Sequence, residues 1–131
     1  MESFTVSLPI PPRQLSPNSR NHWRGKHRHS TAYRGKCRDA VLSLMAEGSV
    51  CMESDWSESK LVPTYFHKDR RRRDRDNLSA MLKAAYDGIA EALGVDDYGF
   101  RPTMPEVDVD KDDPRVEIVV TVGDPPGDPS P

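Results

Sequence analysis

Alternating polar and apolar residues predict the strands of this chain. Residues 3–8 place Phe4, Val6 and Leu8 on one face, which is the period of a half-buried strand. Another strand-like segment contains Pro63, and since proline cannot donate to a strand ladder, we expect that strand either at a sheet edge or starting after Pro63. The predicted strands are residues 3–8, 60–67, 104–111 and 115–122.

Two further segments carry apolar residues at steps of three and four, the period of a helix with one buried face. They run from Ser30 or Thr31 to about Glu47 and from about Asn77 to Leu93. Gly48 stops the first, and Gly94 is a natural cap for the second. The buried stripe of the second helix is Leu78, Leu82, Ala85 and Ile89, with Ala92 or Leu93.

The resulting order, β-α-β-α-β-β, predicts an α+β fold, a small mixed sheet packed with two main helices. The 131 residues are close to the usual size of one domain. We assign residues 1–122 to that domain and expect the Pro/Gly/Asp-rich tail, residues 123–131, to be disordered.

Composition narrows the cellular setting. No apolar run has membrane-spanning length, and no signal-peptide core is present, which indicates a cytosolic protein. Cys37 and Cys51 have neither metal-type nor redox-type spacing, so we expect free thiols.

The net charge of −2 conceals an uneven distribution. Residues 13–38 carry eight Lys or Arg and no acid, and residues 68–75 carry six bases against two acids. From residue 84 onward there are twelve acids against three bases. Basic segments are typical of proteins that bind the phosphate backbone of nucleic acids. The alternative is an ordinary solvated surface.

The most informative stretch is Arg70–Arg73 followed by Asp74, Asp76 and Asn77. Guanidinium groups suit phosphate oxygens, and paired carboxylates suit Mg²⁺. The alternative is a solvated arginine run with helix-capping aspartates. We favour the site for Mg²⁺ and phosphate over the capping alternative, because capping requires only one of the two aspartates.

Residues 13–29 form a predicted basic loop, in which Trp23 either stacks on a base or anchors the loop. Three histidines there, His22, His27 and His29, have no second pair of ligands with zinc-site spacing, so zinc is weakly supported.

Together these motifs resemble the RusA family of Holliday junction resolvases. The resemblance rests on the prolines after the first strand, on Arg70–Asn77, on Lys83–Asp87 and on Asp96–Asp97. The stretch Leu15–Trp23 is also similar to the N-terminal loop of phage-type members.

The resemblance implies a homodimeric, Mg²⁺-dependent endonuclease, with Mn²⁺ as the alternative metal. Such an enzyme nicks two opposing strands of a four-way DNA junction during recombination or repair, in bacterial or phage-infected host cytoplasm. Asp74, Asp76 and Asp97 match the metal-binding aspartates, and Lys83 matches the essential lysine. This lysine follows Asp76 by seven residues rather than four, a spacing that keeps the same helix face.

Basic residues near these aspartates are expected to bind backbone phosphates. The predicted DNA-binding residues are Arg70, Arg71, Arg72, Arg73, Arg75, Asn77, Arg20, Arg24, Lys26 and Arg28. A continuous helix over 77–93 spans about 25 Å, which separates Asp76 from Asp97. Either the chain doubles back after Gly94, or a partner subunit supplies Asp97.

Three other functions fit the same residues. A nuclease could act on flaps or forks, a non-catalytic module could bind DNA through the basic segments alone, and a structural protein could use the aspartates only as caps.

Overall fold

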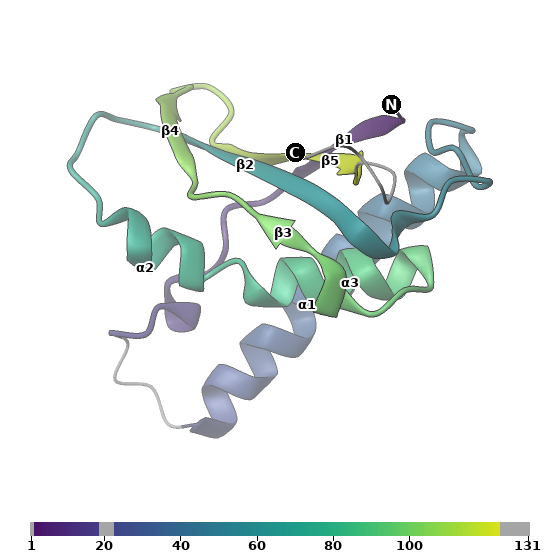
Figure 1. The fold of residues 1–131 in the computed structure, drawn as a ribbon. Helices are drawn as coiled ribbons and strands as arrows, with labels where there is room; N and C mark the ends of the chain where they lie inside the picture. Colours follow the sequence, from purple (N-terminus) through teal and green to yellow (C-terminus); the bar gives the residue numbers. More distant parts are fainter. Residues whose placement is uncertain (1, 19–22, 124–131) are drawn as a thin grey trace, which may run out of the picture.

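A five-stranded mixed sheet with two main helices on one face forms the molecule, which confirms the α+β class (Figure 1). The computed structural model describes residues 2–18 and 23–123. The main elements are β1 (Ser3–Leu8), α1 (Trp23–Ala46), β2 (Ser59–His67), α2 (Arg75–Ala80), α3 (Lys83–Leu93), β3 (Arg101–Pro102), β4 (Glu106–Val109) and β5 (Arg115–Val122). Short 3-10 turns cover Arg13–Leu15, Trp56–Glu58 and Asp97–Gly99.

The sheet is antiparallel on one side of β2 and parallel on the other. β5 lies between β1 and β2 and pairs antiparallel with both. β3 and β4 follow one another along the other side of β2, each parallel to it. The predicted alternation in β1 is confirmed, because Phe4, Val6 and Leu8 are buried and their neighbours are exposed.

Pro63 lies inside β2, which has neighbours on both sides, so both predictions, an edge position and a strand that starts after Pro63, were wrong. The Leu61 carbonyl accepts from the Thr103 amide on the parallel side of β2 (2.9 Å), and main-chain groups two residues apart face the same side. The Pro63 nitrogen, which carries no hydrogen, therefore faces the gap between β3 and β4. β3 pairs with residues 60–61 and β4 with residues 64–67. No ladder bond is lost there.

Helix α1 begins at Trp23, seven residues before the earlier of the two predicted caps, so the last part of the predicted basic loop is helical. No proline interrupts residues 23–46, and Lys, Arg and Ala favour a helix. The predicted apolar stripe is confirmed, with Tyr33, Cys37 and Val41 buried. Gly48 after α1 and Gly94 after α3 have φ angles of 80° and 72°, which glycine adopts without strain.

The predicted second helix is divided into α2 and α3. The Leu82 amide donates to the Ser79 carbonyl at 3.1 Å, a tighter turn than an α-helix makes. Leu82 has φ −90° and ψ 0°, and the next helix starts at Lys83. The break lets Leu78, Met81 and Leu82 all be buried.

Close packing of α1 against α3 depends on Gly88. A Cβ atom at Gly88 would lie 2.4 Å from the Arg34 carbonyl oxygen and 3.1 Å from the Cys37 Cβ. Glycine is therefore required for this approach of the two backbones.

The remaining observations concern one tryptophan, the two cysteines, the C-terminal tail and the absence of a membrane-spanning helix in the described ranges. Trp56 packs on the core edge-on to Phe4, and its indole N–H donates to the Cys51 carbonyl. Cys37 and Cys51 are free, as expected. The predicted tail lies outside the described residues from 124 onward. In the described ranges, no helix combines the length and apolarity needed to cross a bilayer.

Candidate functional site

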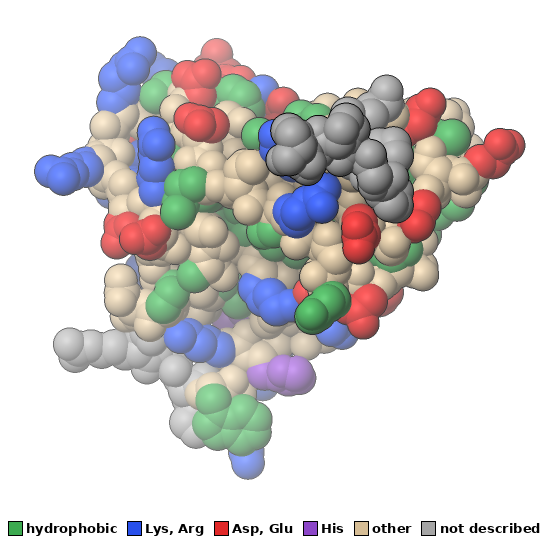
Figure 2. Space-filling view, in the orientation of Figure 1, with side chains coloured by type: hydrophobic (Ala, Val, Ile, Leu, Met, Phe, Trp, Pro, Cys, Tyr) green, Lys and Arg blue, Asp and Glu red, His purple; other side chains and the backbone are tan. Residues whose placement is uncertain are grey.

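The arginine run forms an exposed loop at the end of the central strand, between β2 and α2. Arg70, Arg71 and Arg72 are exposed. Figure 2 shows Lys and Arg side chains projecting at the side where Figure 1 places this loop, with acidic side chains beside them. Three cationic groups are thus available to an anionic partner.

Arg73 differs from its three neighbours, because it stabilises the loop. Its guanidinium donates to the Asp69 carboxylate (3.0 Å) and to the carbonyls of Asp69 (3.2 Å) and Arg71 (2.9 Å). The Arg71 amide also donates to Asp69, and this bond, followed by the Arg73 contact, lowers the pKa of the Asp69 carboxyl. Sequence reasoning had assigned Arg73 to DNA and had not singled out Asp69.

Asp74 caps α2, as the simpler alternative predicted. Its carboxylate accepts from the Asp76 amide at 2.9 Å, which satisfies one of the helix's first donors. That bond uses the Oδ1 atom. Asp76 lies in the first turn, and both residues are exposed.

The two aspartates do not pair with their cationic neighbours. Among residues 2–18 and 23–123, no Lys, Arg or His side-chain nitrogen lies within 4 Å of the carboxylates of Asp74 or Asp76. The neighbouring arginines therefore do not engage these carboxylate oxygens in the described part of the chain.

Lys83 and Asp97 do meet. The Lys83 ammonium donates to Asp87 at 2.7 Å and to Asp97 at 2.6 Å. The chain doubles back after Gly94, as one of the two predicted arrangements requires, and Asp96 caps the following turn by accepting from the Tyr98 amide. The contact with Asp87 was not predicted, although its spacing of four residues from Lys83 was a signal for it.

Lys83 and Asp97 strengthen one another's charged forms. The bond to Asp87, followed by that to Asp97, raises the pKa of the Lys83 ammonium. The bond from Lys83 is the main cause that lowers the pKa of the Asp97 carboxyl. Lys83 is largely exposed, so water and salt screen these interactions.

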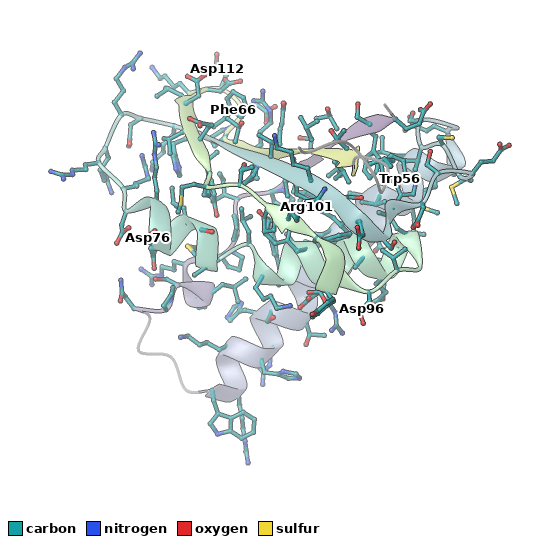
Figure 3. The ribbon with its side chains drawn as sticks, in the orientation of Figure 1. Trp56, Phe66, Asp76, Asp96, Arg101 and Asp112 are labelled. Atoms are coloured by element: carbon teal, nitrogen blue, oxygen red, sulfur yellow. The ribbon has the colours of Figure 1, made fainter. Side chains whose placement is uncertain are left out.

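The carboxylates of Asp74 and Asp76 are separate from this cluster. Figure 3 shows Asp76 on α2 well apart from Asp96, the neighbour of Asp97. In the described part of the chain, no three His, Cys, Asp or Glu residues form a group able to hold a metal ion. A single chain therefore brings Lys83 to Asp97 but does not bring Asp76 to Asp97.

The remaining predicted DNA-binding residues occupy two places. Arg24, Lys26 and Arg28 are in the first turns of α1, which extends beyond the rest of the fold in Figure 1. Arg75 begins α2. Asn77 follows two residues later, and its side-chain oxygen accepts a hydrogen bond from the Ser16 hydroxyl (2.8 Å). Arg20 lies outside the described residues.

Removing one member of the cluster should lower stability slightly. The folded-state pKa of Asp97 lies below its unfolded value. The ion pair of Lys83 and Asp97 therefore stabilises the fold at pH values above the unfolded carboxyl pKa, and this contribution is lost as pH falls through the lowered folded-state pKa. We expect Asp97→Asn to lower the free energy of unfolding by at most about 1 kcal/mol at pH 7. The deficit should shrink as pH falls through the lowered pKa, because Asp97 is then protonated in both the folded and the unfolded state.

Denaturant unfolding at pH 7 and pH 3 measures this difference. Asp112→Asn is the control, since Asp112 lies in an exposed turn. An equal deficit for Asp97→Asn at both pH values would show that the ion pair is not its cause.

Comparison with known proteins finds a relative, but it does not indicate an activity. No family model matches the chain. The chain is similar to an uncharacterized protein of Xylella fastidiosa (strain Temecula1 / ATCC 700964), with 35% identity over 107 residues. The match covers 76% of this chain and 63% of that protein, so the chain spans less than two thirds of its relative.

Proposed function

We propose that the chain is a Mg²⁺-dependent endonuclease of the RusA type that cuts four-way DNA junctions. The observation that carries the proposal is the pair of exposed carboxylates of Asp74 and Asp76, which form no ion pair within residues 2–18 and 23–123 and follow the exposed Arg70–Arg72 run near the end of the central strand. Strand ends held by a rigid scaffold commonly carry catalytic residues. Arginines that bind the DNA backbone would bring a phosphate close to Asp74 and Asp76.

The donor atoms of Asp74 and Asp76 fit Mg²⁺. This ion takes oxygen ligands, keeps several waters, and is often held by one or two carboxylates together with substrate phosphates. Asp74 would use the oxygen not engaged by the Asp76 amide, and Asp76 would use its whole carboxylate. The ion would lower the pKa of a bound water and stabilise charge on the phosphate.

Lys83 is suited to holding a phosphate in position. Its raised pKa makes the ammonium a poor proton donor, and its exposure leaves it accessible to DNA. Asp87 and Asp97 would orient the ammonium. In this role Asp97 acts through Lys83, and its expected place as a third metal ligand requires a second subunit or a change of conformation on binding.

Two symmetric nicks require two sites. A twofold homodimer would present two identical sites to the two opposing strands of a junction. The separation of Asp76 from Asp97 within one chain favours a second candidate function, in which the protein binds branched DNA without cutting it.

A substrate panel tests these functions. Labelled four-way junctions, forks, flaps and linear duplexes would be incubated with the protein over a range of Mg²⁺ and Mn²⁺ concentrations. Metal-dependent paired nicks in the junction support the proposal, and cutting only of forks or flaps indicates another structure-selective nuclease. Tight junction binding without cutting at any metal concentration would establish the binding module instead.

Arg70, Arg71 and Arg72 should contribute most to the salt dependence of DNA binding. Replacing all three with Gln should reduce the slope of log affinity against log salt by about 2–3, since each phosphate contact contributes about 0.9. Fluorescence anisotropy at several salt concentrations measures the slope. Lys60→Gln is the control, because Lys60 is exposed at the opposite end of β2; an unchanged slope in the triple variant would exclude the loop from the interface.

A further inference from the structure

Residues 23–32 of α1, here called the α1 extension, project beyond the rest of the fold (Figure 1). Tyr33 is the first buried residue of the helix, and residues 23–32 are all exposed or half-buried. The α1 extension is about 15 Å long at about 1.5 Å per residue. Helices in proteins are stabilised mainly by burying an apolar face, so packing within this fold does not account for the α1 extension.

The charges of the α1 extension suit an anionic partner. Arg24, Lys26 and Arg28 lie on it, and the next acidic residue along the helix is Asp39. The partial positive charge at the start of a helix favours acids, yet the first turn of α1 contains none. These cations therefore oppose the helix dipole rather than stabilise the helix, whereas DNA phosphates would compensate them.

Trp23 begins the helix, at the tip of the α1 extension, and 66% of its surface is exposed. The hydrophobic core therefore does not anchor it, in contrast to Trp56, which is 3% exposed. The Arg24 guanidinium lies over the indole ring, 5.3 Å from its centroid. Arg24 is exposed and long, so a base can take its place on the ring while the guanidinium binds a phosphate. Aromatic rings among cations are typical of surfaces that bind unpaired bases.

The chain keeps Trp23 within reach of the proposed metal ligands. The Ser16 hydroxyl donates to the side chain of Asn77, the neighbour of Asp76. Trp23 follows Ser16 by seven residues, so no more than about 25 Å separates their Cα atoms. This span is shorter than one helical turn of DNA, about 34 Å, so a branched DNA bound at Asp76 can also contact Trp23.

A second copy of the chain fits the α1 extension less well than DNA does. Apart from glycine, only Trp23 and Ala32 are apolar among residues 23–32. Stable interfaces between protein subunits need a larger apolar centre with few charges. One large aromatic ring between cations instead matches a base and its flanking phosphates.

We propose that the α1 extension recognises the branch point of the DNA. Trp23 stacks on a base that is exposed where the duplexes of the junction separate, and Arg24, Lys26 and Arg28 bind the flanking phosphates. Every base has a π-face, so this contact selects branched DNA over linear duplex without selecting a sequence. The inference rests on the proposed function, because it takes branched DNA as the substrate.

Anisotropy with a labelled four-way junction and with a linear duplex, in Ca²⁺ in place of Mg²⁺, tests the proposal. Trp23→Ala should weaken junction binding about 5- to 100-fold, the range for losing one stacked base, and leave duplex binding nearly unchanged. Trp23→Phe keeps an aromatic face and should retain most of the affinity. Since stacking releases no counterions, Trp23→Ala should not change the slope of log affinity against log salt, whereas replacing Arg24, Lys26 and Arg28 with Gln should reduce it.

Leu42→Ala is the matched control. Leu42 is also an exposed apolar residue of α1 but lies outside the α1 extension, so this variant should bind both DNAs as the wild type does. Sedimentation without DNA should show the same oligomeric state for Trp23→Ala and the wild type. A change in that state would overturn the proposal in favour of a second copy of the chain.

The outcomes separate this inference from the nuclease proposal. Equal losses on junction and duplex in Trp23→Ala, or no loss on either, would overturn the role of Trp23 and leave the nuclease proposal standing. A loss confined to the junction, in a protein that cuts no DNA at any Mg²⁺ or Mn²⁺ concentration, would support the role of Trp23 and remove the nuclease. If the wild type binds no DNA, both proposals fail.

Discussion

Replacing Asp76 with Asn should reduce cleavage by about 10²- to 10³-fold or more and leave junction binding intact. The substitution removes one negative charge from the proposed two-carboxylate site while keeping nearly the same shape. Losing metal stabilisation worth several kcal/mol corresponds to this loss of rate. Binding should persist or become tighter, because Asn removes repulsion between the carboxylate and DNA phosphates. Single-turnover cleavage in Mg²⁺ and anisotropy in Ca²⁺ measure the two effects separately.

A matched control separates this local effect from a general change of surface charge. Glu53→Gln also removes one exposed negative charge, but Glu53 lies in the loop before β2, far from the site. We expect wild-type cleavage in this variant. If Asp76→Asn cuts as fast as wild type, Asp76 is no metal ligand; if it loses binding together with cleavage, the effect is on DNA affinity rather than on chemistry.

Substituting Ala for Gly88 should destabilise the protein by about 1–3 kcal/mol. A new Cβ would lie 2.4 Å from the Arg34 carbonyl oxygen and 3.0 Å from the Arg38 amide nitrogen, so the two helices would have to separate. Overpacking of this kind exceeds the gain from replacing glycine within a helix. Urea unfolding should show a lower midpoint with an unchanged slope.

Gly35→Ala provides the opposite expectation in the partner helix. A Cβ there would meet only the Arg38 guanidinium, at 3.8 Å, which is an ordinary contact. We expect a gain of about 0.5–1 kcal/mol, because alanine favours a helix more than glycine does. Equal effects of the two substitutions would exclude close α1–α3 packing as the role of Gly88.

Local patterns were sufficient to predict most elements of the fold. The alternation in β1, the stripe of α1 and the glycines after α1 and α3 depend on neighbours in the sequence, so they are visible in it. The central position of β2 could not be inferred from Pro63, because it depends on where β3 and β4 divide. The break between α2 and α3 was also hidden, since the apolar stripe continues through it.

The candidate site was predictable in residue type but not in grouping. Sequence reasoning identified Asp74, Asp76, Lys83 and Asp97 and expected them to converge. It could not determine that Lys83 would bond to Asp87 and Asp97, because the path after Gly94 depends on tertiary packing.

The division between α2 and α3 means that the two halves of the site have different supports. The Tyr65 hydroxyl donates to the Leu78 carbonyl at 2.7 Å, which ties α2 to the central strand, whereas α3 rests on α1 through Gly88. A disturbance of the helical layer would therefore displace Lys83 and leave the acidic pair of α2 in place. Evolution can adjust the Lys83 ammonium and the carboxylates of α2 independently, through mutations in separate parts of the chain.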